Sequence, residues 1–170
     1  THVNLGSILI KHGKLRDAEL STRKAIELKP DFAEAHSNLG NILSALNKLQ
    51  DAELSYRKAI ELNPDFAEAH YNLGIILSDL GKSQESFSSF LRVIEIKTTL
   101  SNIYPVITRF LKDSDPSQLN QSQLKSILIL LLKRNDVPHN ELRRAFKLIY
   151  SEEIISNVET FDSDFSNIDL

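Results

Sequence analysis

The sequence predicts an all-α fold, in which a stack of helix hairpins over residues 1–97 is followed by further helices over residues 98–170. The first observation behind this prediction is a repeat, because residues 18–40 and 52–74 differ at only three positions. A fixed spacing of 34 residues between two such copies is typical of repeat arrays. The second observation is that apolar residues in each copy recur three and four positions apart, which is the period of an amphipathic helix.

The middle copy, residues 33–66, is predicted to be a hairpin of two helices. The first helix, residues 33–46, turns one stripe inward, made of His36, Leu39, Gly40, Leu43 and Leu46. Residues 47–50 form the turn, and the second helix, residues 51–63, turns inward Ala52, Tyr56, Ala59 and Ile60. Pro64 ends this helix, because the residue before a proline is pushed out of the α region. Small residues such as Gly40 and Ala52 should let the helices approach closely.

The three copies resemble the tetratricopeptide repeat (TPR), whose pattern is W-x2-L-G-x2-Y followed by A-x3-F, A and P. The Trp position of this pattern is taken by His2, His36 and His70, the Leu-Gly pair by Leu5-Gly6, Leu39-Gly40 and Leu73-Gly74, and the Tyr position by Leu9, Leu43 and Leu77. The A-x3-F positions are taken by Ala18, Ala52 and Ser86 and by Thr22, Tyr56 and Phe90. The last two positions are taken by Ala25, Ala59 and Val93 and by Pro30 and Pro64. The resemblance implies a right-handed α-solenoid of three hairpins. We expect further repeats before Thr1, because the first copy is truncated. The third copy, with Thr98 in place of proline, is interpreted as the last repeat.

Residues 98–170 carry no repeat, and we predict helices over residues 101–113, 124–136, 139–150 and 152–158. The segment 124–136 is apolar nearly all round and is expected to be buried on more than one side. The segment 98–170 is interpreted as a helical cap on the open end of the solenoid. The alternative is a connector to a further domain. A small basic cluster, interpreted as a solvated face, comprises Lys133, Arg134, Arg143, Arg144 and Lys147.

The sequence offers little for catalysis. It has no cysteine, which excludes disulfides and thiolate zinc sites. It contains no phosphate-binding loop, no HExxH motif and no nucleophile elbow, so we predict no catalytic residue, no metal and no cofactor. His2, His36 and His70 recur once per copy, roughly 10 Å apart, and are interpreted as packing residues rather than metal ligands.

The composition also restricts the partners. A net charge of −3 gives no overall attraction to nucleic acid, and no apolar run is long enough to cross a membrane. We expect neither as a partner, and we expect a cytoplasmic location.

In TPR arrays the first helix of each hairpin lines a concave groove, which the resemblance places along three sets of residues. The predicted peptide-binding residues are Asn4, Ser7, Lys11, Ser37, Asn38, Asn41, Ser44, Tyr71, Asn72, Ile75 and Asp79, and the same helices also carry Glu34 and Glu68. Asn4, Asn38 and Asn72 occupy one motif position and resemble the asparagine ladder of the O-GlcNAc transferase superhelix, which grips peptide backbone. An amide offers both a donor and an acceptor to a peptide unit. The alternative is that the asparagine recurs only because the whole repeat was duplicated.

The function predicted from these observations is a scaffold that binds a protein or an extended peptide in the groove. Two alternatives remain open. The chain could be the recruiting arm of a bacterial TPR–transferase protein, with a methyltransferase or glycosyltransferase domain elsewhere. It could instead be a self-assembly scaffold that associates through the open ends of the repeat array.

Overall fold

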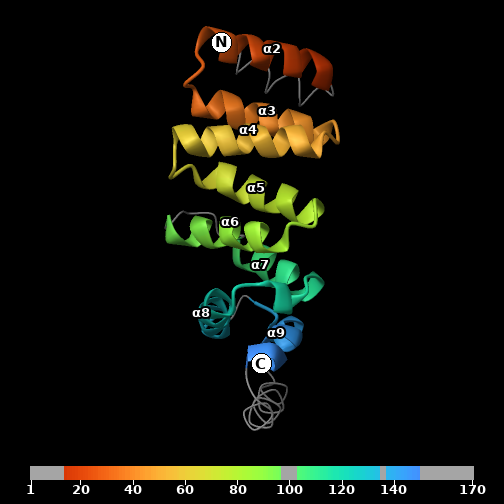
Figure 1. The fold of residues 1–170 in the computed structure, drawn as a ribbon, viewed down its shortest axis with the longest axis vertical. Helices are drawn as coiled ribbons and strands as arrows, with labels where there is room; N and C mark the ends of the chain where they lie inside the picture. The colour runs from red at the N-terminus through yellow and green to blue at the C-terminus, as the bar shows by residue number, and fades with distance from the viewer. Residues whose placement is uncertain (1–13, 97–102, 135–136, 150–170) are drawn as a thin grey trace, which may run out of the picture. The chain divides into compact units, whose positions relative to one another are not determined.

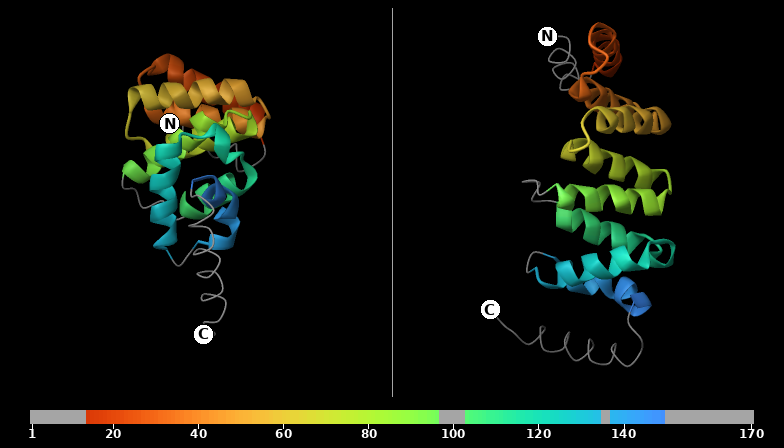
Figure 2. Two further views of the ribbon diagram at one scale, coloured as in Figure 1. Left: turned by 60° about the horizontal axis from the view of Figure 1, so that its bottom comes forward. Right: turned by 60° about the vertical axis from the view of Figure 1, so that its left-hand side comes forward.

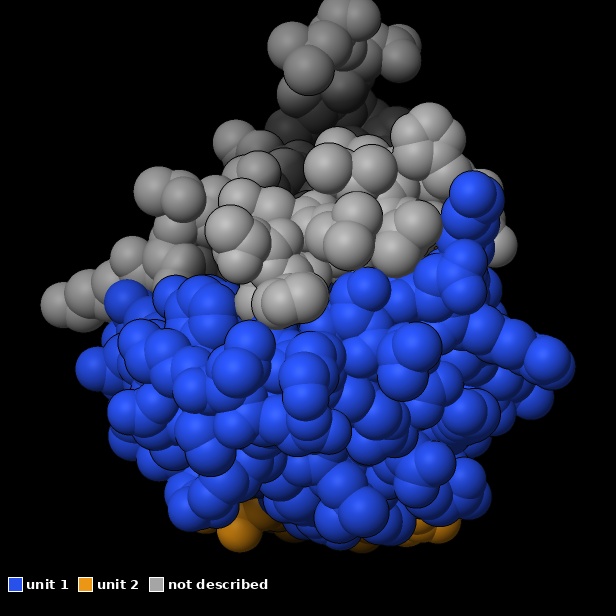
Figure 3. Space-filling model, turned by 90° about the horizontal axis from the view of Figure 1, so that it is seen from above, with its two compact units in different colours: residues 1–100 blue, residues 101–170 orange. Residues whose placement is uncertain are grey.

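The structure is a computed structural model that describes residues 14–96, 103–134 and 137–149. The chain forms two compact units, residues 1–100 and residues 101–170, shown in separate colours in Figure 3. Every regular element among the described residues is an α-helix or a short 3-10 helix. The predicted all-α fold is therefore confirmed.

Unit 1 is a stack of helices that follow one another in chain order (Figure 1). After α2 (Leu15–Leu28) come one hairpin of α3 (Ala33–Ala45) and α4 (Leu49–Leu62) and a second of α5 (Ala67–Asp79) and α6 (Ser83–Glu95). Each helix packs on the next, as further views show (Figure 2). These are the hairpins predicted for the second and third copies.

The hairpin turn explains why α4 begins earlier than predicted. Asn47 takes a left-handed conformation, with φ at 57°, and its N–H donates to the Ser44 carbonyl at 2.9 Å. The N–H of Lys48 donates to the Leu43 carbonyl at 2.8 Å. This pair of bonds is a Schellman motif, which ends a helix and reverses the chain within a few residues. The second helix therefore starts at Leu49, two residues before the predicted start.

The third copy repeats this turn with glycine. Gly81 has φ at 74°, a conformation that glycine adopts without steric cost. The N–H of Lys82 donates to the Leu77 carbonyl at 2.8 Å, as in the copy before.

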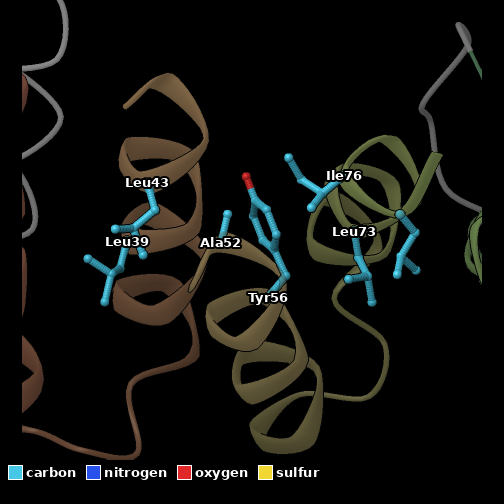
Figure 4. Close-up of a cluster of buried hydrophobic side chains, with 7 residues drawn as sticks. Leu39, Leu43, Ala52, Tyr56, Leu73 and Ile76 are labelled. Carbon is cyan, nitrogen blue, oxygen red and sulfur yellow. The ribbon is translucent and has the colours of Figure 1, made fainter. Parts of the chain in front are cut away.

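Tyr56 lies at the centre of the unit 1 core. Its ring is 2% exposed and projects from α4 between leucines of α3 and the apolar side chains of α5 (Figure 4). The cluster around it contains Leu39, Leu43, Ala52, Leu73, Ile76 and Leu77. Residues of three successive helices therefore meet on one aromatic ring, which ties the second copy to the third.

Two glycines make room for such rings. A Cβ atom on Gly40 would lie 2.6 Å from Cε1 of Tyr56, and one on Gly74 would lie 2.5 Å from Cε1 of Phe90. These separations are far shorter than any van der Waals contact. The prediction that small residues bring the helices together is confirmed, since Ala52 and Gly40 are both buried.

Unit 2 contains α7 (Ile103–Asp113), a 3-10 turn η1 (Pro116–Gln118), α8 (Gln121–Leu132), a second 3-10 turn η2 (His139–Leu142) and α9 (Arg143–Ile149). Pro105 is the third residue of α7, where its missing N–H costs no helical bond. Asn120 caps α8 by accepting a hydrogen bond from the Gln123 N–H at 3.0 Å. The predicted helix over residues 152–158 lies outside the described residues.

One prediction for unit 2 was wrong. The helix α8 is buried on one face only, through Leu124, Ile127, Leu128 and Leu131. On its other sides Ile129, Leu130 and Leu132 are 41%, 36% and 44% exposed. Within unit 2, α8 packs against η2 and α9, and these cover a single face. The role of residues 98–170 as a cap stays a prediction.

Candidate functional site

Eight of the predicted groove residues lie on two helices, α3 and α5, and the remaining three, Asn4, Ser7 and Lys11, lie outside the described residues. Asn38, Asn41, Ser44, Tyr71 and Asn72 are half-buried, whereas Ile75 and Asp79 are exposed. The polar side chains of α3 recur at intervals of three and four, as do those of α5, so each helix presents one continuous stripe. We call the two stripes the first-helix face and count in it Glu34, Asn38, Asn41, Ser44, Glu68, Tyr71, Asn72, Ile75 and Asp79.

Ser37 departs from the sequence-based expectation. Its side chain is 2% exposed, and its hydroxyl has no hydrogen-bond partner among the described residues. A buried hydroxyl cannot line a surface, so we leave Ser37 out of the first-helix face.

Three polar side chains of the face and of the core are joined by hydrogen bonds. The Tyr56 hydroxyl donates to Oδ1 of Asn41 at 2.7 Å, and Nδ2 of Asn72 donates to the same oxygen at 3.0 Å. This Asn41–Tyr56–Asn72 network links α3, α4 and α5. It brings together Asn41, at the ninth motif position of the second copy, and Asn72, at the sixth motif position of the third copy.

The sequence contains a signal for this network that our reading missed, because we assigned Tyr56 to packing alone. In the third copy, Phe90 takes the place of Tyr56 and Ile75 takes the place of Asn41. The amide of Asn41 therefore occurs together with the hydroxyl of Tyr56, and the aliphatic side chain of Ile75 occurs together with Phe90, which has no hydroxyl. The paired change indicates that the two positions touch.

The surroundings of Tyr56 keep its phenol protonated. Burial of the ring raises the pKa of Tyr56 well above its ordinary value, and the negative charge of Glu68 raises it further. The hydroxyl therefore remains a donor to Asn41.

No ion pair among the described residues of unit 1 involves α3 or α5. In the first copy Glu19 accepts hydrogen bonds from Arg23 and from Lys48, both at 2.9 Å. In the second copy Glu53 binds Arg57 and Lys82, at 2.9 Å and 2.8 Å. Each lysine precedes the second helix of the following copy. The pairs therefore form a ladder, which we call the ion-pair ladder, along the second helices.

The first helices carry a different charge. The helix α3 contains one acidic residue, Glu34, and α5 contains two, Glu68 and Asp79, whereas neither helix contains lysine or arginine. None of these three carboxylates takes part in an ion pair within the described residues. In the described residues, the first-helix face therefore carries three carboxylates and no lysine or arginine.

Comparison with known protein families assigns the repeat. One family model, described as a TPR repeat, matches residues 40–81. Two further models, each described as a tetratricopeptide repeat, match residues 22–53 and, in two separate matches, residues 1–32 and 67–99. Together the matches run from residue 1 to residue 99 without a gap. Residues 1–99 are tetratricopeptide repeats.

Solved structures agree with the TPR assignment. MamA is similar over 92% of this chain and 79% of its own, with a TM-score of 0.64 and 22% sequence identity. The first TPR of Spaghetti (RPAP3), solved with the HSP90 peptide SRMEEVD, is similar over 64% of this chain and 86% of its own, with a TM-score of 0.62 and 21% identity. A solution structure of the first TPR domain of human RPAP3 gives the same values. No curated protein sequence matches this chain significantly.

The TPR histidines have a structural role in this chain. His36 Nε2 is 2.8 Å from the Pro30 carbonyl oxygen, and His70 Nε2 is 2.9 Å from that of Pro64. Each imidazole thus holds the loop that leads into its own hairpin. In the part of the chain that the structure describes, no three histidine or acidic side chains gather as a metal site. Among the described helices, none is long and apolar enough to cross a membrane.

Proposed function

We propose that this chain is a TPR scaffold that binds proteins through an extended peptide laid on the first-helix face. The observation that carries the proposal is the division of polar groups in unit 1. The ion-pair ladder runs along the second helices, whereas the first helices present amides, and carboxylates that make no ion pair among the described residues. A surface of this kind offers hydrogen bonds to a ligand.

The asparagines supply the most general of these bonds. The Asn72 amide uses one N–H on Asn41, which leaves its second N–H and its carbonyl for a peptide unit. Asn38 occupies the same motif position one copy earlier and is half-buried on α3. Rungs spaced by roughly 10 Å match about every third residue of an extended peptide, which advances about 3.3 Å per residue. Binding of this type tolerates many peptide sequences.

The fold gives the proposal support of a second kind. The RPAP3 domain, which is similar in fold, is solved with a bound peptide of HSP90. A transferase arm and a self-assembly scaffold, the two alternatives raised by the sequence, stay predictions.

The test removes the amides. The variant in which Asn4, Asn38 and Asn72 are all alanine should remain folded by circular dichroism, because alanine is the better helix former. Each lost hydrogen bond contributes roughly 1 kcal/mol, so affinity for a panel of unrelated extended peptides should fall on the order of 100-fold. Gln50→Ala is the matched control, because it removes an exposed amide from α4.

Two results would overturn the asparagine assignment. Unchanged peptide affinity in the folded triple variant would mean that the asparagines recur only through duplication. An unfolded triple variant would mean that they are structural. If the unaltered chain binds no extended peptide at all, the proposed function itself fails.

A further inference from the structure

The helix α8 has a second apolar side that no described element covers. Its buried side, which includes Leu124 and Leu128, packs against η2 and α9. On the opposite side, Ile129 and Leu132 are both exposed. A single exposed apolar residue needs no explanation, but large apolar residues that share one helix face indicate a contact surface. The question is which partner packs there.

Two lysines frame this apolar side of α8. Lys125, Ile129, Leu132 and Lys133 stand at i, i+4, i+7 and i+8, so they share one face of the helix. Both lysines are exposed, and neither takes part in an ion pair among the described residues. We call these four residues the α8 outer face. It has an apolar centre and a positive charge at each end.

The segment that directly follows α9 carries a complementary sequence pattern. Its apolar residues recur at intervals of four, three, four and three, at Ile154, Val158, Phe161, Phe165 and Ile168. This spacing predicts an amphipathic helix with one apolar stripe, which extends beyond the helix predicted over residues 152–158. In such a helix Glu153 and Asp164 lie along one edge of the stripe, and Asp162 and Asp169 lie along the other.

The charges of the two regions are also opposite. Residues 103–149 contain eight lysines and arginines and four acidic residues, whereas residues 150–170 contain six acidic residues and no basic one. The acidic segment is rich in serine, asparagine and aspartate, which are weak helix formers. Its helix therefore depends on packing of the apolar stripe against a partner. The segment starts at the end of α9, and α9 packs against α8.

We infer that residues 150–170 fold back along α8 as a helix and cover the α8 outer face. The apolar stripe packs on Ile129 and Leu132, and carboxylates along its edges pair with the two lysines. The stripe from Ile154 to Ile168 is about 21 Å long at about 1.5 Å per residue, and the outer face is about 12 Å long on the same measure. One docked helix is therefore long enough to cover the whole face. This inference does not depend on the first-helix face.

The segment of the same chain is favoured over that of a second copy. Residues 150–170 are joined to α9, and a segment tethered by a short connection has an effective concentration on the order of millimolar at its site. A second copy reaches that concentration only in a very concentrated solution. The outer face is therefore occupied within each chain.

The experiment exploits the absence of cysteine from the chain. Ser163→Cys introduces a single thiol on the side of the predicted helix that faces away from the apolar stripe. A nitroxide spin label attached there broadens the nuclear magnetic resonance signals of nearby backbone amides. In the full chain we expect the amide signals of residues 125–133 to be lost. Dilution of the isotope-labelled, spin-labelled chain with unlabelled chain should leave this loss unchanged.

Two double variants distinguish docking from the mere closeness of a tethered segment. Phe161→Ser with Phe165→Ser removes the aromatic residues of the stripe, and Lys125→Glu with Lys133→Glu reverses the charge of the outer face. Each should restore most of the lost signal, and circular dichroism checks that each variant is folded. Salt at about 1 M should also restore part of the signal in the unaltered outer face, because it screens exposed charges.

The matched control is Lys14→Glu with Lys24→Glu, which reverses two exposed lysines of unit 1 and should leave the signal loss intact. Loss that survives both double variants and high salt would show that the segment is only tethered nearby, and the inference would fail. It would also fail if the signals of residues 125–133 were never lost. Loss seen only when spin-labelled and isotope-labelled chains are mixed would assign the face to a second copy instead.

Discussion

The first and second helices of the described TPR hairpins differ in whether their charged side chains form ion pairs. On the second helices, acidic and basic side chains pair within one copy and reach across to the next, as Glu53 does with Arg57 and with Lys82. On α3 and α5, the polar side chains include amides and carboxylates, and no ion pair of the described residues involves them. Ion pairs therefore join the second helices of neighbouring copies, and none among the described residues joins the first helices.

The difference teaches where function can reside in a repeat that was copied nearly whole. The residues of the ion-pair ladder recur at a spacing of 34 because the contact between neighbouring copies recurs. The first helices differ at fewer positions between the second and third copies, where Asn41 becomes Ile75 and Ala45 becomes Asp79.

The largest expected effect concerns Tyr56, the residue that joins the two kinds of helix. Tyr56→Ala removes a fully buried ring between α3 and α5 and should lower the free energy of unfolding by about 3–5 kcal/mol. Denaturant unfolding followed by circular dichroism measures this loss.

Tyr56→Phe separates the ring from its hydroxyl. It keeps the packing and removes the hydrogen bond to Asn41, so it should cost only about 1 kcal/mol. If both variants lose the same amount, the hydroxyl rather than the ring holds the copies together, and our account of the core is wrong.

The next largest effect tests the close approach of helix and ring. Gly74→Ala would place a methyl group 2.5 Å from the Phe90 ring, so the ring or the helix must move. Overpacking of this kind costs typically about 1–3 kcal/mol. Thermal unfolding of this variant should be compared with that of Ser78→Ala, an exposed position of the same helix. A Gly74→Ala variant as stable as the control would show that α5 and α6 are not tightly packed.

The smallest effect concerns the ion-pair ladder and depends on pH. Burial alone would raise the pKa of Glu53, but the hydrogen bonds from Lys82 and Arg57 outweigh it and lower the pKa below the ordinary 4.5. A lowered pKa in the folded state stabilises the fold above pH 4.5, and this stabilisation is lost as the pH falls below that value.

Glu53→Gln should therefore cost about 0.5–1 kcal/mol at neutral pH, because its partners are solvent-exposed, and progressively less as the pH falls below the ordinary pKa. Urea unfolding at neutral and acidic pH measures the difference. Glu34→Gln, on the first-helix face, should change the unfolding free energy by less than about 0.5 kcal/mol. A larger loss in Glu34→Gln than in Glu53→Gln would reverse the comparison between the two faces.

Much of the fold could be predicted from the sequence because the repeat carries its own boundaries. Pro64 marked the end of α4, and the apolar stripe through Leu39 and Leu43 marked the buried face of α3. The start of α4 at Leu49 could not be read this way, because the Schellman motif depends on the left-handed conformation of Asn47. Hydrophobic periodicity carries no information about that angle.

The candidate site was predicted less completely. Motif positions placed Asn38 and Asn72 on the first helices, but the bond between Asn72 and Asn41 joins residues of different copies and has no local signal. The apolar composition of α8 misled us, because a helix with leucine on every side can still pack on one side only. The composition of a helix shows which of its faces are apolar enough to be buried, but the neighbouring elements determine which faces are buried in the fold.

The central claim is that ligands bind the first helices while the second helices hold the array together. It is tested most directly by nuclear magnetic resonance of the isotope-labelled chain during titration with the peptide of the unrelated extended panel that binds most tightly. The account predicts shifts of the Asn38 and Asn72 side-chain amides and of backbone amides in α3 and α5, with little change around Glu53 and Lys82. Shifts concentrated on α4 and α6, with the asparagine amides unmoved, would contradict it.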